Sequence, residues 1–324
     1  MLNTSIIIFV LFLLAFGGFA AYDLATAKKS KVVYRVKSSV TAYLMLLPAV
    51  ALAFLFVMLP ILYSLGYAFT DYYLLKPNDI KFVDIQNFVA FFEELSTKGT
   101  LYNAIKNTLT FVVGVVPLQI GLALLLALFV NRPGVGSKIF KVCFFAPVVI
   151  SLSVTAFLWE QILAPGADGM LNSIVGLFGM APHDWLRDPN TAMPCIIVLS
   201  AWQGCGYQML IFLSGLSNIR KDLYEAAALD GANWWRKFWL VTWVGLRSTF
   251  VYILITVFIG ACRILTQPML MTGYMDHTVT LSYYMYNKGY TERWVGYSSA
   301  VALLMTIFIG GITLIQRRIF REEK

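Results

Sequence analysis

The chain has 324 residues, of which 59% are hydrophobic and 13% are charged, and its mean hydropathy is +0.72. Soluble domains are about 45–50% apolar and roughly 25% charged. The composition therefore excludes a disordered chain, a coiled coil and a nucleic-acid-binding surface. A chain this apolar places most of its surface in lipid, so we expect a membrane protein.

Charge-free stretches long enough to cross a bilayer define the predicted elements. A membrane helix needs about 20 apolar residues, and seven stretches meet that requirement, with Arg263 as the one interruption. They lie at 6–21, 38–70, 107–131, 142–159, 189–219, 248–275 and 294–316. We predict an all-α polytopic membrane protein with about seven transmembrane helices.

The first of these stretches, 6–21, is open to a second interpretation. Ala25-Thr26-Ala27 resembles the small-residue cleavage site of a secretory signal. However, no Lys or Arg precedes the apolar run and five follow it, which is the order typical of a retained helix. We expect it to be kept as a transmembrane helix.

The basic residues predict the orientation. Of the 25 Lys and Arg residues, 17 fall in one set of alternating loops, seven in the other, and Arg263 lies within the sixth span. Cytoplasmic loops carry the excess of Lys and Arg. The N-terminus is therefore predicted outside and the C-terminus in the cytoplasm, and the net charge of +8 reflects topology rather than a polyanionic partner.

Residue types suited to metal binding or nucleophilic catalysis are scarce. The four cysteines lie in apolar runs, where they behave as small hydrophobes, and the two histidines, His183 and His277, lie in polar stretches. We expect no metal site, no disulfide framework and no cofactor held by this chain. The chain is accordingly not expected to be an enzyme.

Several local patterns refine these elements. Phe88, Phe91, Phe92 and Leu95 recur at helical spacing within the external segment 71–100, which predicts an amphipathic helix on the outer surface. Pro268 is expected to end the sixth span. Prolines inside other spans indicate breaks whose freed carbonyls need new partners.

One predicted cytoplasmic segment, 219–241, stands out by its length and polarity. Asp222 and Glu225 fit a variant of the helix-capping box, Ala226 and its neighbours favour helix, and Asp230-Gly231 permits a sharp turn. The pattern predicts a short, thin helix suited to a groove in another protein. A capped structural loop is the alternative that the residues alone leave open.

A family resemblance decides between these alternatives. Glu225-Ala226-Ala227 followed after three residues by Gly231 resembles the EAA loop in the membrane subunits of bacterial ABC importers, and the surrounding residues resemble the carbohydrate-uptake branch, which includes maltose- and glycerol-phosphate-type permeases. The likeness covers about 40–320. Further matching stretches are Phe82–Phe88, Asn107–Leu109, Asp184–Leu186, Trp202–Gly204 with Gly206, and Gly296–Ala300.

The resemblance implies that this loop is the coupling helix that docks into an ATP-hydrolysing subunit. It assigns Glu225 the main polar contact, Ala226 and Ala227 the close-packed face, and Asp230 with Gly231 the turn. No glycine of the chain is followed by lysine, so a Walker A loop is excluded. ATP and Mg would therefore belong to the partner subunit.

The chain departs from the family pattern just after this loop. Family members continue with two prolines, whereas the corresponding positions here are Val244 and Ser248. We expect the bend into the sixth span to form at Gly245 instead.

A solute pathway is predicted from polar residues inside the spans. Arg263 is the one ionisable residue deep in a span, where charges by default mark a pathway or a buried pair. Pairing with Asp276 or snorkelling to the border is the alternative. Around it, amides and aromatic rings suit a sugar, although helix packing would select the same residues. The candidates are Trp202, Gln203, Tyr207, Gln208, Arg263, Thr266 and Gln267.

The resemblance predicts a permease subunit forming half of the pathway for a sugar or oligosaccharide, an acidic one included, in the bacterial inner membrane. We expect an N-terminal helix and basic linker at 1–37 and a permease core at 38–324. The implied partners are a second permease, two ATP-binding subunits, an external solute-binding protein and membrane lipid, with no nucleic acid. An ion-coupled secondary transporter is the main alternative, although such carriers usually hold intramembrane acids. A membrane enzyme is the second.

Overall fold

The computed structural model describes residues 33–131, 134–166 and 169–320, together with seven separate positions between 10 and 22. These residues form helices, turns and two isolated β-bridges, without a β-sheet. The predicted all-α fold is confirmed for this part of the chain. The first predicted span, 6–21, lies outside the continuously described residues.

Five described helices are long and apolar enough to cross a membrane, or six if a bent pair of helices counts as one span. These helices account for the second to seventh predicted spans. The five are Ala42–Tyr67, Thr100–Val130, Ala192–Ser217, Trp234–Met271 and Val295–Ile319.

The bent pair covers the fourth predicted span, 142–159, which is one of the spans in which a proline indicated a break. Helix α6 (Val135–Val149) and helix α7 (Leu152–Ile162) meet at an angle of 99°. Pro147 lies in the last turn of α6, and Ile150 is extended, with φ −71° and ψ 135°. Ser151 then caps α7, accepting a hydrogen bond from the N–H of Val154 at 3.4 Å.

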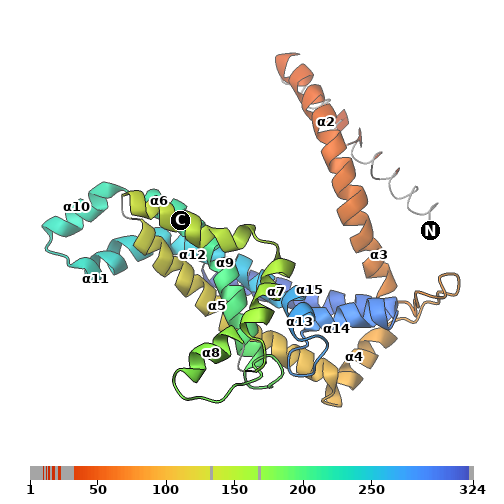
Figure 1. Cartoon of the computed structure of the whole chain (residues 1–324). Coiled ribbons are helices and arrows are strands. Elements are labelled where there is room, and N and C mark those ends of the chain that lie inside the picture. Colours follow the sequence, from red (N-terminus) through yellow and green to blue (C-terminus); the bar gives the residue numbers. More distant parts are fainter. Residues whose placement is uncertain are drawn as a thin grey trace. The chain divides into compact units, whose positions relative to one another are not determined.

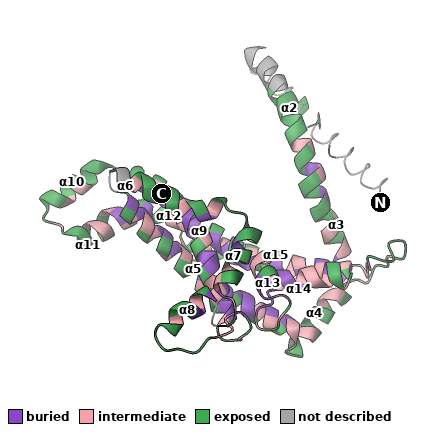
Figure 2. Cartoon of the chain, viewed as in Figure 1, coloured by how far each residue is buried: buried purple, intermediate pink, exposed green. Residues whose placement is uncertain are grey.

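The chain divides into two compact units. One comprises the described residues up to Asn87 together with Trp294–Ala300. Its long helix consists of α2 (Val33–Ala53), a π-helical turn η1 (Phe54–Met58) and α3 (Leu59–Tyr67). From Ala42 to Tyr67 the side chains of this helix are mostly exposed (Figure 2), as expected for a helix that meets lipid.

Two stretches that the resemblance singled out meet within this first unit. The Asn87 side-chain amide donates to the carbonyls of Ala68 at 2.9 Å and Thr70 at 2.8 Å. Gly296 packs on the same segment of chain, and its N–H donates to the carbonyl of Tyr72 at 3.0 Å. Both stretches therefore stabilise the turn that follows α3.

The second unit contains the main core. Helices α5 (Thr100–Val130), α9 (Ala192–Ser217) and α12 (Val244–Cys262) pack together (Figure 1) and carry most of its buried apolar side chains. The predicted amphipathic helix is α4 (Gln86–Ser96), with Phe91 buried. It is joined to α14 (Leu281–Tyr286) by the Tyr284 hydroxyl, which donates to Glu94 Oε1 at 2.6 Å.

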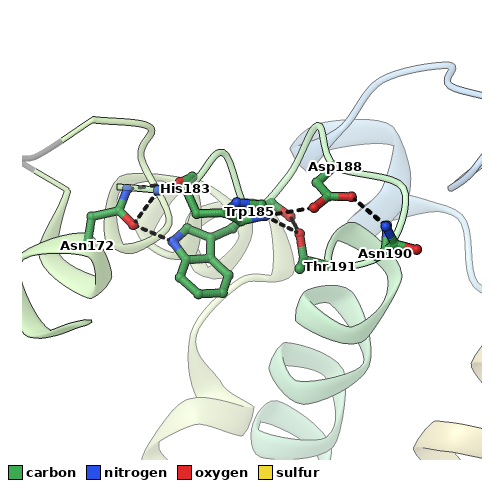
Figure 3. Close-up of polar contacts among 6 residues, drawn as sticks. All are labelled: Asn172, His183, Trp185, Asp188, Asn190 and Thr191. Atoms are coloured by element: carbon green, nitrogen blue, oxygen red, sulfur yellow. Dashed lines mark hydrogen bonds and ion pairs between the residues drawn. The ribbon is translucent and has the colours of Figure 1, made fainter. Parts of the chain in front are cut away.

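A polar network holds the loop between α8 (Met170–Gly176) and α9 (Figure 3). Asn172 Oδ1 accepts hydrogen bonds from the His183 backbone N–H at 3.1 Å and from the Trp185 indole N–H at 2.8 Å. His183 Nε2 lies 2.9 Å from Asp188 Oδ2, and the Thr191 hydroxyl donates to the Trp185 carbonyl at 2.8 Å. These bonds fix the point at which α9 begins.

The sixth predicted span needs two corrections. Helix α12 ends at Cys262, before Pro268, which instead lies inside α13 (Thr266–Met271). The entry to α12 does not bend at Gly245. Helix α11 (Trp234–Lys237) continues through a π-helical turn η2 (Phe238–Trp243) into α12, so Gly245 lies within continuous helix. Without the two prolines, every residue here keeps a backbone N–H for helical bonding.

Three further described elements lie in the second half of the chain. Helix α10 (Lys221–Leu229) lies between α9 and α11, a π-helical turn η3 (Asn287–Thr291) follows α14, and α15 (Val295–Ile319) is the final helix.

Candidate functional site

The nine-residue helix α10 lies at the end of α9 opposite the network of Figure 3, and it extends from the bundle with α11 (Figure 1). Its N-cap is Arg220 rather than Asp222, and no side chain caps it. The predicted capping box is therefore wrong. Asp222 lies in the first turn, where its carboxylate is bound by the Arg220 guanidinium, with Nε at 3.1 Å from Oδ1.

The C-terminal end of α10 is closed as the sequence predicts. Gly231 has φ +72°, a conformation that side chains with a Cβ rarely adopt. Its N–H bonds to the Ala228 carbonyl at 3.1 Å, and the N–H of Ala232 bonds to the Ala227 carbonyl at 2.9 Å. This pair of bonds is a Schellman motif, which satisfies carbonyls at the end of the helix.

A side-chain contact holds α10 against the helical segment that follows it, while one face of α10 stays open. The Tyr224 hydroxyl lies 3.0 Å from the Thr242 hydroxyl in η2, and the Asn233 side chain caps α11. Glu225 and Ala226 are exposed and Ala227 is half-buried. Leu229, four residues after Glu225, is 90% exposed. The open face thus combines a carboxylate, small side chains and one unburied leucine.

A cavity of about 610 Å³ lies within the second unit. It is lined by residues of α5, α9, α12 and α13 and of the segments between them, with Val148 and Leu152 from the bent pair. Five of the seven predicted pathway residues line it, namely Gln203, Gln208, Arg263, Thr266 and Gln267. Residues as distant in sequence as Phe111 and Gln267 are brought together here.

Gln203 links the cavity to the break between α6 and α7. Its Nε2 lies 3.4 Å from the Ile150 carbonyl and 3.3 Å from the Thr155 hydroxyl. The amide therefore bonds a carbonyl that the break leaves without a helical partner, as the proline-containing spans require.

Two further polar groups of the lining have no hydrogen-bond partner among the described residues. They are Ser200 Oγ and Gln208 Oε1, and their residues are only 9% and 8% exposed. Leaving such a group buried and unpaired costs about 1–3 kcal/mol. A hydroxylated ligand in the cavity would supply the missing bonds.

Arg263 follows the last residue of α12 and lines the same cavity. The alternative in which Asp276 pairs with it is wrong, because Asp276 forms no ion pair with Arg263 and its Oδ1 instead accepts a hydrogen bond from the Thr100 hydroxyl at 3.0 Å. Within the described ranges, no carboxylate lies within ion-pairing distance of Arg263.

Trp202 and Tyr207 are not among the residues that line the cavity. The Trp202 ring packs on Trp159, with 5.8 Å between ring centroids, and Tyr207 is half-exposed. Sequence reasoning also missed Gln119, Ser200 and Thr256, which do line it. Gln119 had a usable signal, because it is an amide in a long apolar run. It lies against Gly204, where a Cβ would come within 2.2 Å of its Nε2.

The comparison with protein families covers both the exposed helix and the cavity. The family described as binding-protein-dependent transport system inner membrane component matches residues 119–321. The chain belongs to this family. The match includes α10 and almost all of the cavity lining.

Individual relatives of this family member extend over most of its length. The probable ABC transporter permease protein YesP of Bacillus subtilis is 32% identical and covers 86% of this chain and 90% of its own. The lactose transport system permease protein LacF of Rhizobium radiobacter is 31% identical over 88% of this chain and 95% of its own. A solved bacterial alginate ABC transporter, crystallised with a periplasmic protein that holds an alginate pentasaccharide, has a chain of the same fold. Its TM-score is 0.74 at 23% identity, over 91% of this chain and 100% of that chain.

Family membership establishes the class of protein. The chain is a multi-pass membrane component of a binding-protein-dependent transport system, and the ion-coupled carrier is not supported. The family is one of transport components, so this chain is not an enzyme. Among the described residues, no group of three or more His, Cys, Asp or Glu side chains is placed to hold a metal ion.

Proposed function

We propose that this family member is the permease subunit of an ATP-driven importer and forms half of the pathway for a sugar or oligosaccharide. The observation that carries the proposal is the cavity, whose polar lining consists of amides, hydroxyls and one guanidinium, with no carboxylate among its described residues. Such a lining suits a solute rich in hydroxyl groups. The lactose permease and the alginate transporter among the similar proteins support a carbohydrate.

We propose that α10 transmits the work of ATP hydrolysis to this cavity. Glu225 makes the main polar contact with the ATP-binding subunit, Ala226 and Ala227 form the close-packed face, and Asp230 with Gly231 fixes the turn. The open face of α10 supports this role, because its side chains make few contacts within the described chain. Coupling of this kind requires contacts that differ between two states of the transporter.

The remaining parts of the assembly follow from this role. The proposed core, 38–324, pairs with a second permease, two ATP-binding subunits that carry ATP and Mg, and an external solute-binding protein. The proposed membrane orientation places α10 in the cytoplasm and the network of Figure 3 outside. The N-terminus then lies outside and the C-terminus inside.

Reconstitution tests the proposal. Proteoliposomes would contain this chain, the second permease and the ATP-binding subunits, with the solute-binding protein added outside, and uptake of labelled sugars would be measured. We expect uptake to require ATP hydrolysis and to fail when the ATP-binding subunit is omitted. Uptake that persists without that subunit would contradict the proposal.

A matched pair of variants tests the role of the loop. Gly231→Asp would place a bulky charged side chain at the turn of α10, whereas Gly179→Asp makes the same change at φ +77° in the loop after α8. Both positions have open space around the new Cβ. We expect only the first variant to lose ATP-dependent uptake. Equal loss in both would contradict coupling through α10.

A further inference from the structure

We propose that the transported solute is an acidic oligosaccharide and that Arg263 binds its carboxylate inside the cavity. This inference rests on the proposed function, because it names the substrate class of the same cavity. It is carried by three observations: the charge of the lining, its unpaired polar atoms and the place of Arg263 among them.

The charge of the cavity is the first observation. Of the 18 described residues that line it, Arg263 alone is ionisable. A cation in the apolar part of a membrane protein is costly unless it is paired or faces water. Asp276 does not pair with it, and no other described carboxylate lies within ion-pairing distance. A carboxylate on the solute would neutralise the positive charge of Arg263, and a guanidinium binds a carboxylate through two parallel hydrogen bonds.

The unpaired atoms are the second observation, and they indicate hydroxyl groups beside the charge. Ser200 Oγ and Gln208 Oε1, both on α9, are buried and have no hydrogen-bond partner among the residues that the structure describes. A simple organic acid would satisfy Arg263 and leave both atoms unpaired. Sugar hydroxyls both donate and accept, so a uronate sugar matches all three groups at once.

The position of Arg263 is the third observation. It lies at the junction of α12 and α13, and Gln267 follows it by four residues in the same lining. The α9 residues reach the cavity from a different helix. A solute that contacts both Arg263 and the α9 residues would therefore place its carboxylate at the α12–α13 junction and its hydroxyl groups against α9.

The choice of a carboxylate over a phosphate follows from charge balance. One guanidinium neutralises one carboxylate. A phosphate monoester carries a charge of about −1.5 to −2 at pH 7, so part of that charge would stay uncompensated in a lining without a second cation. The volume of about 610 Å³ lies within the usual range for small-molecule sites, about 300–1,000 Å³.

The test uses the complete reconstituted transporter and matched sugar probes. The probes are galacturonate and mannuronate oligosaccharides of two to four residues, their methyl esters, the neutral disaccharides lactose and maltose, and glucose 6-phosphate. Methyl esterification removes the charge and keeps the hydroxyl groups and linkages. ATP-dependent uptake is compared in wild type, Arg263→Gln and Arg263→Lys. Arg187→Gln serves as the control, since it removes an exposed arginine from the loop before α9.

We expect wild type to take up at least one uronate series tenfold or more faster than its methyl ester. Arg263→Gln should lower uronate uptake at least tenfold while changing uptake of the ester less than twofold. Arg263→Lys should give an intermediate rate, because lysine keeps the charge without the bidentate geometry. Arg187→Gln should leave both rates unchanged.

Three results would overturn the inference. Equal uptake of uronates and esters in wild type would show that charge is not recognised, and preference for glucose 6-phosphate would assign the arginine to phosphate. Equal loss of charged and neutral probes in Arg263→Gln would show that Arg263 instead pairs with a partner subunit. A different result would contradict the proposed function itself: no charged or neutral sugar probe enters the proteoliposomes in the presence of ATP. Neutral sugars entering alone would overturn only the acidic substrate.

Discussion

The α10 loop and the cavity are two regions where polar side chains gather in a mostly apolar chain, and they are built in opposite ways. The loop is contiguous in sequence, exposed, and fixed by a local Schellman turn and one hydroxyl contact. The cavity is assembled from helices distant in sequence, and two of its polar groups are buried without a hydrogen-bond partner in the described part of the chain. Contiguous, exposed residues suit docking to another protein, whereas converging buried groups suit a solute. The two regions should therefore respond differently to substitution.

The largest expected effect is in the loop. Glu225 is exposed and forms no ion pair within the described chain, so Glu225→Ala should leave the permease folded. We expect it to lower ATP-dependent uptake of every solute at least tenfold, because the polar contact with the ATP-binding subunit is lost. Uptake and thermal stability of the purified complex would be measured together. Unchanged uptake by Glu225→Ala would contradict the docking role that separates the α10 loop from the cavity.

A second effect is expected where the cavity meets the broken span. Gln203→Ala removes the amide that bonds the Ile150 carbonyl and the Thr155 hydroxyl. We expect a loss of about 1–3 kcal/mol in the free energy of unfolding, since the carbonyl loses its protein partner. Denaturation in detergent would measure it, with Tyr207→Phe on the same helix as the control. Equal stability of the two variants would contradict a structural role for this amide.

A smaller effect is expected at the turn after α10. Gly231→Ala keeps the backbone path but places a Cβ at φ +72°, which costs about 1–2 kcal/mol. The midpoint of thermal unfolding should fall by a few degrees, and Gly179→Ala, at φ +77°, should lower it similarly. Only the Gly231 variant should also reduce uptake. An equal reduction in both would mean that strain alone, rather than docking, explains the effect.

The smallest effect concerns acid pH and the network of Figure 3. The backbone N–H of Asn190 and then the charge of His183 hold the pKa of Asp188 below its ordinary value of 3.8. The stability contributed by this carboxylate is thus present above pH 4 and is lost as the pH falls through the lowered pKa. The free energies of unfolding of wild type and of Asp188→Asn should differ at pH 6, and they should become equal once the pH falls below the lowered pKa of Asp188. A difference that grows on acidification would contradict this sign.

The loop was predictable because its information is local. The order Glu225-Ala226-Ala227, then Gly231, indicates a short helix and a glycine turn, and the structure has both. The capping box predicted at the start of the helix was wrong. Asp222 has the right chemistry for a cap, but Arg220 binds its carboxylate and takes the N-cap position itself.

The cavity was predictable only in part. Gln203, Gln208 and Arg263 stand out as polar residues in apolar runs, and the structure places all three in one lining. Ser200 and Thr256 carry no such signal, because short hydroxyl side chains also bond helix carbonyls within spans. Pro147 indicates a break in its span, but neither the 99° angle nor the α9 amide that bonds the Ile150 carbonyl is contained in a local pattern.

One measurement tests the central claim most directly: ATP-dependent uptake of a charged sugar and of its neutral methyl ester, compared in Glu225→Ala and Arg263→Gln. We expect Glu225→Ala, the loop variant, to lower both rates by the same factor and to leave their ratio unchanged. The cavity variant should change the ratio at least tenfold. If the loop variant alters the ratio, or the cavity variant lowers both rates equally, the assignment of coupling to α10 and of recognition to the cavity is contradicted.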